Sequence, residues 1–227
     1  METKIISFYT QKGGSGKTTL THLMGIALSA KEVGKKVLVV DSDPQRSLMK
    51  ILEDIRMSNE DPKLKPPYDL VYSPIGEIRD TLRKHHGKYD IILIDMPGTL
   101  DMKGVRSGLL ACDVVFIPIQ PSQLDFVSSR ETIEKIKEIQ QLKKSEKEDF
   151  HYYCLVNQAE PKKVRTRELL EYIGASKIPH LEVPVLRYEK YKDMMNEYSV
   201  DIFKKKNWGN EELALRKVFD EILEKLN

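Results

Sequence analysis

Short, continuous apolar runs of strand length recur along the chain and alternate with helix-like segments. The runs are apolar throughout rather than at every second residue, which is typical of strands that are covered on both faces. Strands and helices that alternate in this way favour an α/β fold, a doubly wound and mostly parallel sheet flanked by helices. The predicted strands are residues 4–9, 36–40, 69–72, 90–95, 113–119, 152–157 and 181–185.

Helical periodicity occupies most of the segments between these strands. The first predicted helix begins at a glycine-rich turn and is expected to stop at Gly34, and the last carries an apolar stripe that would dock on the sheet. The predicted helices are residues 16–34, 75–87, 129–144 and 211–227. The polar, proline-rich residues 57–69 are interpreted as a surface loop. We expect residues 1–227 to form one domain, without an N-terminal helix-turn-helix domain.

Composition restricts the choice of partners only loosely. The 227 residues include 37 basic and 35 acidic side chains, and the formal net charge is +2. A DNA contact would therefore have to be a local basic patch. No apolar run approaches the roughly 18 residues that a bilayer requires. Cys112 and Cys154 are interpreted as two buried thiols rather than as a disulfide framework.

A phosphate-binding turn follows the first predicted strand. Gly16, Lys17 and Thr18 match the end of the G-x-x-x-x-G-K-[ST] pattern, although Gln11 replaces its first glycine. Lys17 would reach the β- and γ-phosphates, the Thr18 hydroxyl would ligate Mg²⁺, and Thr19 could donate to the α-phosphate. The loop residues whose backbone would cradle phosphate are Gly13, Gly14, Ser15 and Gly16. The dinucleotide fingerprint G-x-G-x-x-G fails here, because its third glycine would fall on Thr19. The remaining alternative is a chance glycine turn.

Aspartates end two of the predicted strands, where phosphate chemistry needs acids near a metal. Asp95 ends one buried strand and would hold Mg²⁺ through a bound water. Asp41 and Asp43 end another and would point to the same side in an extended segment. One carboxylate of this pair would orient a metal-bound water, and the other would orient the attacking water. Alternatively, Asp43 begins a turn or caps a helix after Pro44, and the two interpretations are compatible.

Taken together, these motifs resemble the ParA/MinD branch of P-loop ATPases, the deviant Walker A group. The family signature K-G-G-x-G-K-[ST] corresponds to residues 12–18 of this sequence. Its companion motifs correspond to "DSDPQ" at 41–45, "DMPG" at 95–98 and "IPIQPSQLD" at 117–125. The resemblance covers nearly the whole chain and preserves the order of the motifs. It implies a P-loop NTPase fold that binds ATP and Mg²⁺ and hydrolyses ATP.

The resemblance also implies roles for particular residues. Lys12 would be the signature lysine, which reaches across a homodimer to the phosphates bound by the other subunit. Asp43 would position the attacking water, Asp41 would belong to the magnesium shell, and Asn157 would lie near the adenine. With Lys17, this makes Lys12 and Asp43 the expected catalytic residues. Asn157 also has a simpler interpretation as a polar residue at a strand end.

Within that family, the sequence looks most like small partition proteins. Such proteins bind DNA nonspecifically as ATP dimers and are released when a ParB-like partner stimulates hydrolysis, so we expect a cytoplasmic, nucleoid-associated protein with no membrane partner. The C-terminal helix is net acidic, a poor match to anionic lipid, and residues 95–105 lack the cysteine of iron–sulfur relatives. The alternatives are a membrane- or scaffold-associated positioning ATPase of the MinD type and a metabolic enzyme such as a dethiobiotin-synthetase-like ligase. Candidate DNA contacts are Lys162, Lys163, Arg165, Arg167 and residues 204–206 beside Trp208.

Overall fold

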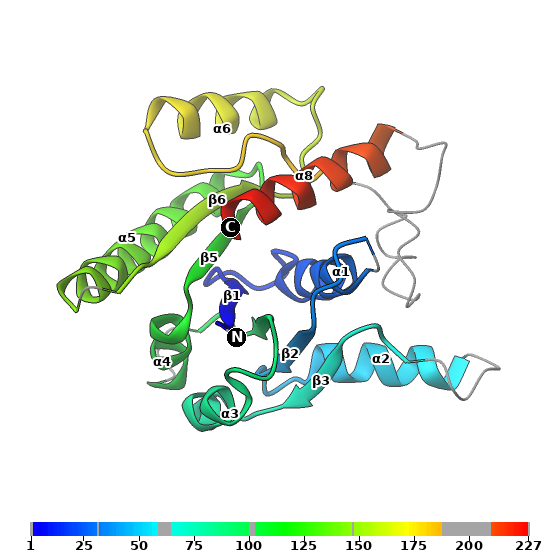
Figure 1. Cartoon of the computed structure of the whole chain (residues 1–227). Coiled ribbons are helices and arrows are strands. Elements are labelled where there is room, and N and C mark those ends of the chain that lie inside the picture. Colours follow the sequence, from blue (N-terminus) through cyan, green and yellow to red (C-terminus); the bar gives the residue numbers. More distant parts are fainter. Residues whose placement is uncertain are drawn as a thin grey trace.

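A computed structural model describes residues 2–30, 32–58, 65–99, 103–146, 148–187 and 210–226. Its centre is a six-stranded sheet in the order β3-β2-β4-β1-β5-β6, and each neighbouring pair is parallel. The strands are β1 (Lys4–Phe8), β2 (Val37–Asp41), β3 (Asp69–Tyr72), β4 (Ile91–Asp95), β5 (Val114–Ile119) and β6 (His151–Val156). Figure 1 shows helices on both sides of this sheet. The predicted doubly wound α/β fold is confirmed.

The helices divide between the two faces of the sheet according to their buried residues. Helices α1 (Lys17–Ser29), α2 (Ser47–Ser58) and α8 (Asn210–Leu226) contribute to the core on one face. The short 3-10 helix η1 (Ile75–Glu77) and helices α3 (Ile78–His85), α4 (Lys103–Ala111), α5 (Gln123–Ser145) and α6 (Val164–Ala175) contribute to the other. Adjacent strand residues such as Ile5 and Ile6 belong to opposite cores, as the period of two requires.

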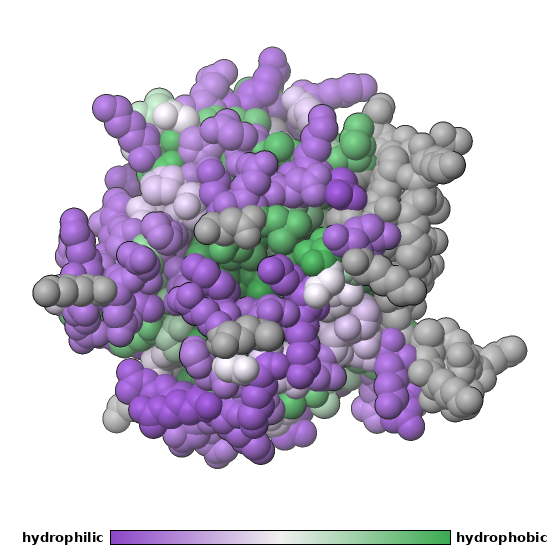
Figure 2. Space-filling view, viewed as in Figure 1, coloured by the Kyte–Doolittle hydropathy of each residue, from purple (hydrophilic) through white to green (hydrophobic). Residues whose placement is uncertain are grey.

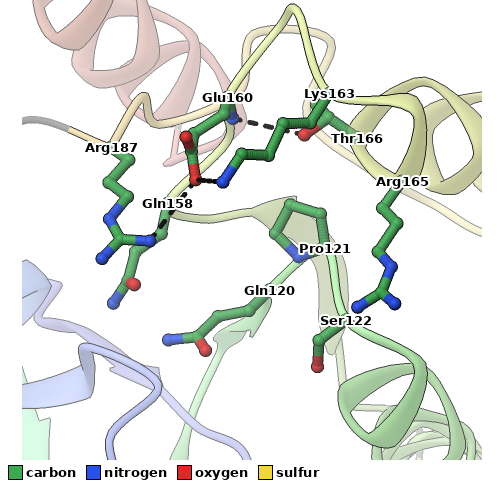
Figure 3. A pocket seen from close by; sticks show the side chains of 9 residues that line it. All are labelled: Gln120, Pro121, Ser122, Gln158, Glu160, Lys163, Arg165, Thr166 and Arg187. Carbon is green, nitrogen blue, oxygen red and sulfur yellow. Dashed lines mark hydrogen bonds and ion pairs between the residues drawn. The ribbon is translucent and has the colours of Figure 1, made fainter.

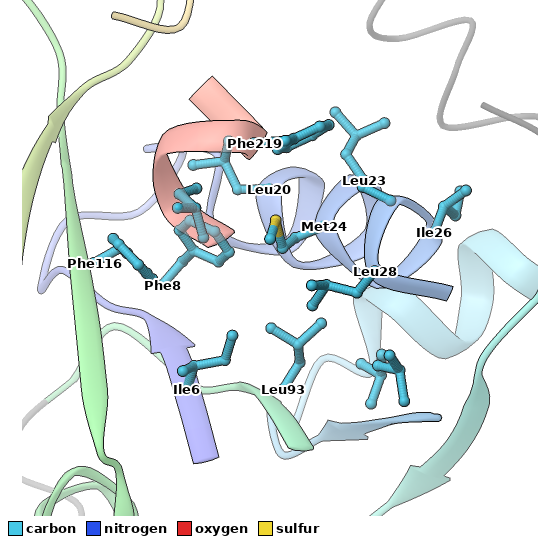
Figure 4. Close-up of a cluster of buried hydrophobic side chains, with 14 of the residues drawn as sticks. Ile6, Phe8, Leu20, Leu23, Met24, Ile26, Leu28, Leu93, Phe116 and Phe219 are labelled. Atoms are coloured by element: carbon cyan, nitrogen blue, oxygen red, sulfur yellow. The ribbon is translucent and has the colours of Figure 1, made fainter. Parts of the chain in front are cut away.

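Helix α8 closes the first core against the phosphate-loop helix. Phe219 from α8 lies among Leu20, Leu23 and Met24 of α1 (Figure 4), and all four side chains are buried. The predicted apolar stripe of the last helix is therefore confirmed. Figure 2 shows the side of the molecule that faces the viewer in Figure 1; its described surface is mainly polar, and apolar side chains show chiefly near the middle of the view.

The segment 181–185, predicted as a strand, is not one. Two isolated parallel bridges flank it, Cys154 with His180 and Ala159 with Leu186. The backbone amides of Leu181 and Val185 donate to the carbonyls of Cys154 and Val156 at 2.9 Å each. The backbone amides of Glu182 and Val183 donate to the Glu221 carboxylate at 2.8 and 3.1 Å, and Pro184 has no N–H. Because these donors are diverted or missing, a regular ladder cannot form there.

Helix boundaries also differ from the predictions. Helix α1 ends at Ser29 rather than at Gly34, because Ala30 takes an extended conformation and Gly34, with φ 66°, lies in the turn that leads to β2. The predicted helices do not include α4 or α6, and α2 corresponds only to the alternative in which Asp43 caps a helix after Pro44. The predicted loop 57–69 lies partly outside the described residues, and its ends belong to α2 and β3.

Two further expectations concern burial and the membrane. Cys112 and Cys154 are both buried and unbridged, as predicted. In the part of the chain that the structure describes, no helix combines the length and the apolar character needed to cross a bilayer.

Candidate functional site

The glycine-rich turn connects β1, a central strand, to the first turn of α1. Gly16 is the N-cap of α1 and has φ 90°, a left-handed conformation that residues with a Cβ rarely adopt. A Cβ at this position would also lie 2.6 Å from the Asn157 side-chain nitrogen. The glycine therefore allows both the sharp turn and the close approach of the β6 end. The result is a loop whose backbone wraps the N-terminus of a helix, the geometry that binds phosphate.

Lys17 extends back into this loop. Its side-chain ammonium donates to the backbone carbonyl of Lys12 at 3.0 Å, and the residue is only 8% exposed. Burial lowers the pKa of Lys17, while the nearby charges of Asp95 and Asp43 raise it. An anion bound in the loop would add a further partner for this ammonium group. The structure thus places Lys17, Asp43 and Asp95 close together, and their roles toward a nucleotide stay predictions.

Asp95 lies at the end of β4, beside the loop, and is 1% exposed. Burial raises the pKa of Asp95 to about 7, with the neighbouring Asp41 and Asp43 adding to the rise and a hydrogen bond with the Thr18 side chain opposing it. Among the described residues, the Oδ2 atom of Asp95 has no hydrogen-bond partner. A buried carboxylate oxygen without a partner, beside a threonine hydroxyl, fits the oxygen ligands that Mg²⁺ prefers.

Asp41 and Asp43 take different positions in the turn after β2. Asp41 is buried, and its carboxylate accepts from the backbone amides of Asp43 (3.2 Å) and Met49 (3.1 Å). Asp43 is half-buried, and its carboxylate accepts from the Gln45 amide at 2.8 Å. The turn interpretation of Asp43 therefore holds. Asp41 anchors the turn to the first residues of α2, and its membership of a magnesium shell stays a prediction.

Side chains at the ends of β5 and β6 brace the loop from the other side. The Asn157 amide donates to the Ser15 carbonyl at 2.7 Å, and Asn157 is buried. The Gln120 amide donates to the Gly14 carbonyl at 2.9 Å. Asn157 thus contacts the loop, and its proposed place near an adenine stays a prediction. Gln120 was not singled out as a site residue, although it lies within the 117–125 motif.

Gly98 packs directly against the loop from the end of β4. A Cβ on Gly98 would lie 2.8 Å from the Gln11 carbonyl oxygen and 3.3 Å from the Lys17 ammonium. The "DMPG" segment therefore approaches the loop more closely than a side chain would permit. This contact explains in steric terms why a glycine follows Pro97.

An open cavity of about 220 Å³ adjoins these bracing residues. In Figure 3 the Glu160 side chain faces two basic side chains that also line the cavity, Lys163 and Arg187. The Glu160 carboxylate lies 2.8 Å from the Lys163 ammonium and 3.4 Å from the Arg187 guanidinium. Arg165 extends along the other side of the cavity (Figure 3). Gln120 and Gln158 line it as well, so the cavity begins beside the residues that hold the loop.

The basic residues predicted to contact DNA differ in whether an acidic side chain already pairs with them. Lys162, Arg165 and Arg167 are exposed at the start of α6, whereas the ammonium group of Lys163 is paired with Glu160. Residues 204–206 and Trp208 lie outside the described residues. Of the predicted basic surface, the structure therefore describes only the residues at the start of α6.

A phosphate loop after a central strand, with buried aspartates at the ends of two neighbouring strands, defines a P-loop nucleotide-binding protein. A profile of the AAA domain family matches residues 3–65 and 47–150, which together cover more than half of the chain. The chain therefore belongs to this family.

Curated relatives confirm the resemblance to the ParA/MinD group. Maintenance of carboxysome distribution protein A of Halothiobacillus neapolitanus is 28% identical over 192 residues, 85% of this chain and 83% of the relative. Chromosome partitioning protein ParA of Caulobacter vibrioides is 29% identical over 152 residues, 52% of this chain and 56% of the relative.

Solved structures share the fold. A plasmid partition protein from Borrelia burgdorferi bound to AMPPNP superposes with a TM-score of 0.74 at 18% identity, over 99% of this chain and 100% of that one. The Mycobacterium smegmatis cobyrinic acid a,c-diamide synthase with an ATP analogue and magnesium has the same TM-score at 22% identity, over 99% and 96% of the two chains. At these identities the likeness is one of fold.

Replacing Gly98 by alanine tests the packing of this site. Because the added Cβ would press on a backbone oxygen, we expect Gly98→Ala to lower the free energy of unfolding by about 1–3 kcal/mol. Urea denaturation measures the change. Gly174→Ala in α6 is the matched control: its Cβ would meet no atom of the described residues within 4 Å, and it should leave stability equal or higher. Equal stabilities for the wild type and Gly98→Ala would contradict the described contact.

Proposed function

We propose that this protein is an ATP-dependent dimerising switch ATPase that binds nonspecific DNA as the ATP dimer and is released by partner-stimulated hydrolysis. The observation that carries the proposal is the arrangement of Lys12, Lys17, Asp43 and Asp95 around one phosphate loop. A lysine within the loop serves nucleotide binding in P-loop proteins generally, whereas Lys12 at the start of the loop is the added feature.

ATP and Mg²⁺ are the ligands that these residues suit. The backbone of residues 13–19 would cradle the phosphates, and Lys17 would contact the β- and γ-phosphates. Thr18 and Asp95 would hold Mg²⁺, which neutralises charge on the phosphates when it is bound. Structures of the same fold with AMPPNP, or with an ATP analogue and magnesium, support this assignment.

Hydrolysis requires a positioned water and stabilisation of the charge that develops on the phosphates. Asp43 would orient a water for attack on the γ-phosphorus, and the bond from that phosphorus to the β–γ bridging oxygen would break, giving ADP and inorganic phosphate. Lys12 of a second subunit would offset the developing charge. Asp43 is close enough to Lys17 to affect its pKa, which supports a place for Asp43 at the phosphate end of the site.

We propose that the ATP dimer binds DNA and that a ParB-like protein stimulates its ATP hydrolysis. Lys162, Arg165 and Arg167 are exposed together at the start of α6, and a dimer would present this basic surface twice. The named activities of the two relatives, carboxysome distribution and chromosome partitioning, support a positioning role of this general kind. We therefore propose that the ATP dimer is nucleoid-associated in the cytoplasm.

Dimer formation tests the switch. The Asp43→Ala variant should bind MgATP without hydrolysing it and should accumulate as a species of twice the chain mass in size-exclusion chromatography with light scattering. Adding Lys12→Ala to this variant should abolish the dimer while nucleotide binding to the monomer persists. Asp43→Ala with ADP is the matched control and should remain monomeric. A persistent monomer with MgATP would contradict the proposal.

Salt-dependent DNA binding tests the basic surface. For the MgATP dimer, Lys162→Ala/Arg165→Ala should weaken binding to random-sequence duplex DNA and lower the slope of log affinity against log salt by about one for each phosphate contact removed. Lys84→Ala, an exposed lysine on α3, is the control and should leave the slope unchanged. Binding to anionic vesicles without binding to DNA would favour the MinD-type alternative and would overturn the assignment.

A further inference from the structure

Arg46 has a backbone conformation that is unusual for its residue type. Its φ is 51°, in the left-handed region that glycine enters at little cost and that other residues avoid. Arg46 closes the turn after β2, because its amide donates to the Asp43 carbonyl at 2.8 Å. Its own carbonyl accepts from the Lys50 amide at 3.0 Å, in the first turn of α2. A residue other than glycine persists in this conformation where the surrounding structure fixes it, so the contacts of the Arg46 side chain bear on the turn.

The Arg46 side chain stacks on an aromatic ring from the neighbouring strand. The central carbon of its guanidinium lies 3.9 Å from the centroid of the Tyr72 ring, within the range of a cation–π contact. Arg46 is itself exposed, so its charge keeps access to water. The contact therefore ties the far end of the turn to β3.

Tyr72 is in turn fixed to the strand that begins the turn. It is the last residue of β3 and lies opposite Asp41 in the parallel register. The amide of the following residue, Ser73, donates to the Asp41 carbonyl at 3.0 Å. The turn from Asp41 to Arg46 is thus held at both ends by the end of β3, and Asp43 lies between the two attachments.

We propose that the stack of Arg46 on Tyr72 is a positioning device for Asp43, which keeps the turn closed and the carboxylate aimed at the phosphate end of the site. This inference rests on the proposed function, since Asp43 is the residue proposed there to orient the attacking water. Arg46 and Tyr72 are positioning residues, and neither is proposed to touch the nucleotide. Loss of the stack would allow the turn to open without removing any phosphate-binding group.

Four variants of the full chain separate the ring, the charge and the backbone. Tyr72→Ala and Arg46→Ala remove the stack, whereas Tyr72→Phe keeps an aromatic face for the guanidinium. Arg46→Gly removes the stack but relieves the left-handed strain. Each variant is measured for kcat and KM with MgATP, and for hydrogen exchange at the backbone amides of Gln45 and Arg46, which donate to Asp43 in the turn.

We expect Tyr72→Ala and Arg46→Ala to lower kcat and to speed exchange at these amides about two- to fivefold, the range that an exposed cation–π contact provides. KM should change less than kcat, because the phosphate loop is intact. Tyr72→Phe should behave like the wild type, and Arg46→Gly should fall between Arg46→Ala and the wild type. The double variant Arg46→Ala/Tyr72→Ala should be no worse than either single variant.

The two measurements separate the failure of this inference from failure of the proposed function. A wild type that does not hydrolyse MgATP would overturn the proposed function, and with it the role of the stack in catalysis. A wild type that hydrolyses ATP, with unchanged kcat and exchange in Tyr72→Ala and Arg46→Ala, would overturn the inference alone. Equal losses in Tyr72→Phe and Tyr72→Ala would also overturn it, because the ring face would then not be what matters.

Discussion

The buried ammonium group of Lys17 is the interaction on which the rest of the site depends. It is held on the Lys12 carbonyl, inside a loop whose glycines permit the backbone to curl around it, and Asp43 and Asp95 lie close enough to influence its pKa. A buried cation is costly to desolvate, so its acidic neighbours and any bound anion stabilise the same arrangement. The site combines this cation with a carboxylate oxygen on Asp95 that has no hydrogen-bond partner within the described part of the chain, and a magnesium nucleotide would complete this combination.

The order of the strands explains why the loop is held so closely. Because β1 lies between β4 and β5, the loop that follows it is flanked on one side by Gly98 after β4 and on the other by Gln120 after β5. Asn157 adds a second brace from β6. The sheet therefore presents a preformed backbone cradle, while the turn between Asp41 and Arg46 depends on β3 at the sheet edge. Because the turn and the phosphate loop are held by different strands, a change in the turn can affect the position of Asp43 without affecting the phosphate-binding loop.

Much of the fold could be predicted from the sequence, because continuous apolar runs bounded by glycine and aspartate identify buried parallel strands. The phosphate loop and its acids followed from motif spacing.

The elements that the sequence did not predict depend on contacts between distant residues. Helix α4 was missed because Gly104 and Gly108 weaken its helical pattern. In the structure a Cβ on Gly108 would lie 2.6 Å from the Met96 sulfur, so the glycine allows close packing. The prediction of a strand at 181–185 was wrong, because the backbone amides of Glu182 and Val183 donate to the carboxylate of Glu221 on α8. Helix α8 is far from this segment in the sequence, so residue spacing does not reveal the contact. The contacts of Asn157 and Gln120 with loop carbonyls likewise depend on tertiary geometry that residue spacing does not encode.

Lys12 is proposed to act on the nucleotide of a neighbouring subunit, and mixing two inactive variants separates this role from an action within its own subunit. Lys12→Ala subunits keep Asp43 but lack the lysine, and Asp43→Ala subunits keep the lysine but cannot orient the water. In a mixed dimer the Lys12→Ala subunit would retain a site with its own Asp43 and receive Lys12 from its partner. We expect MgATP hydrolysis to reappear on mixing, well above that of either variant alone. Activity that stays at the average of the two separate variants would contradict it.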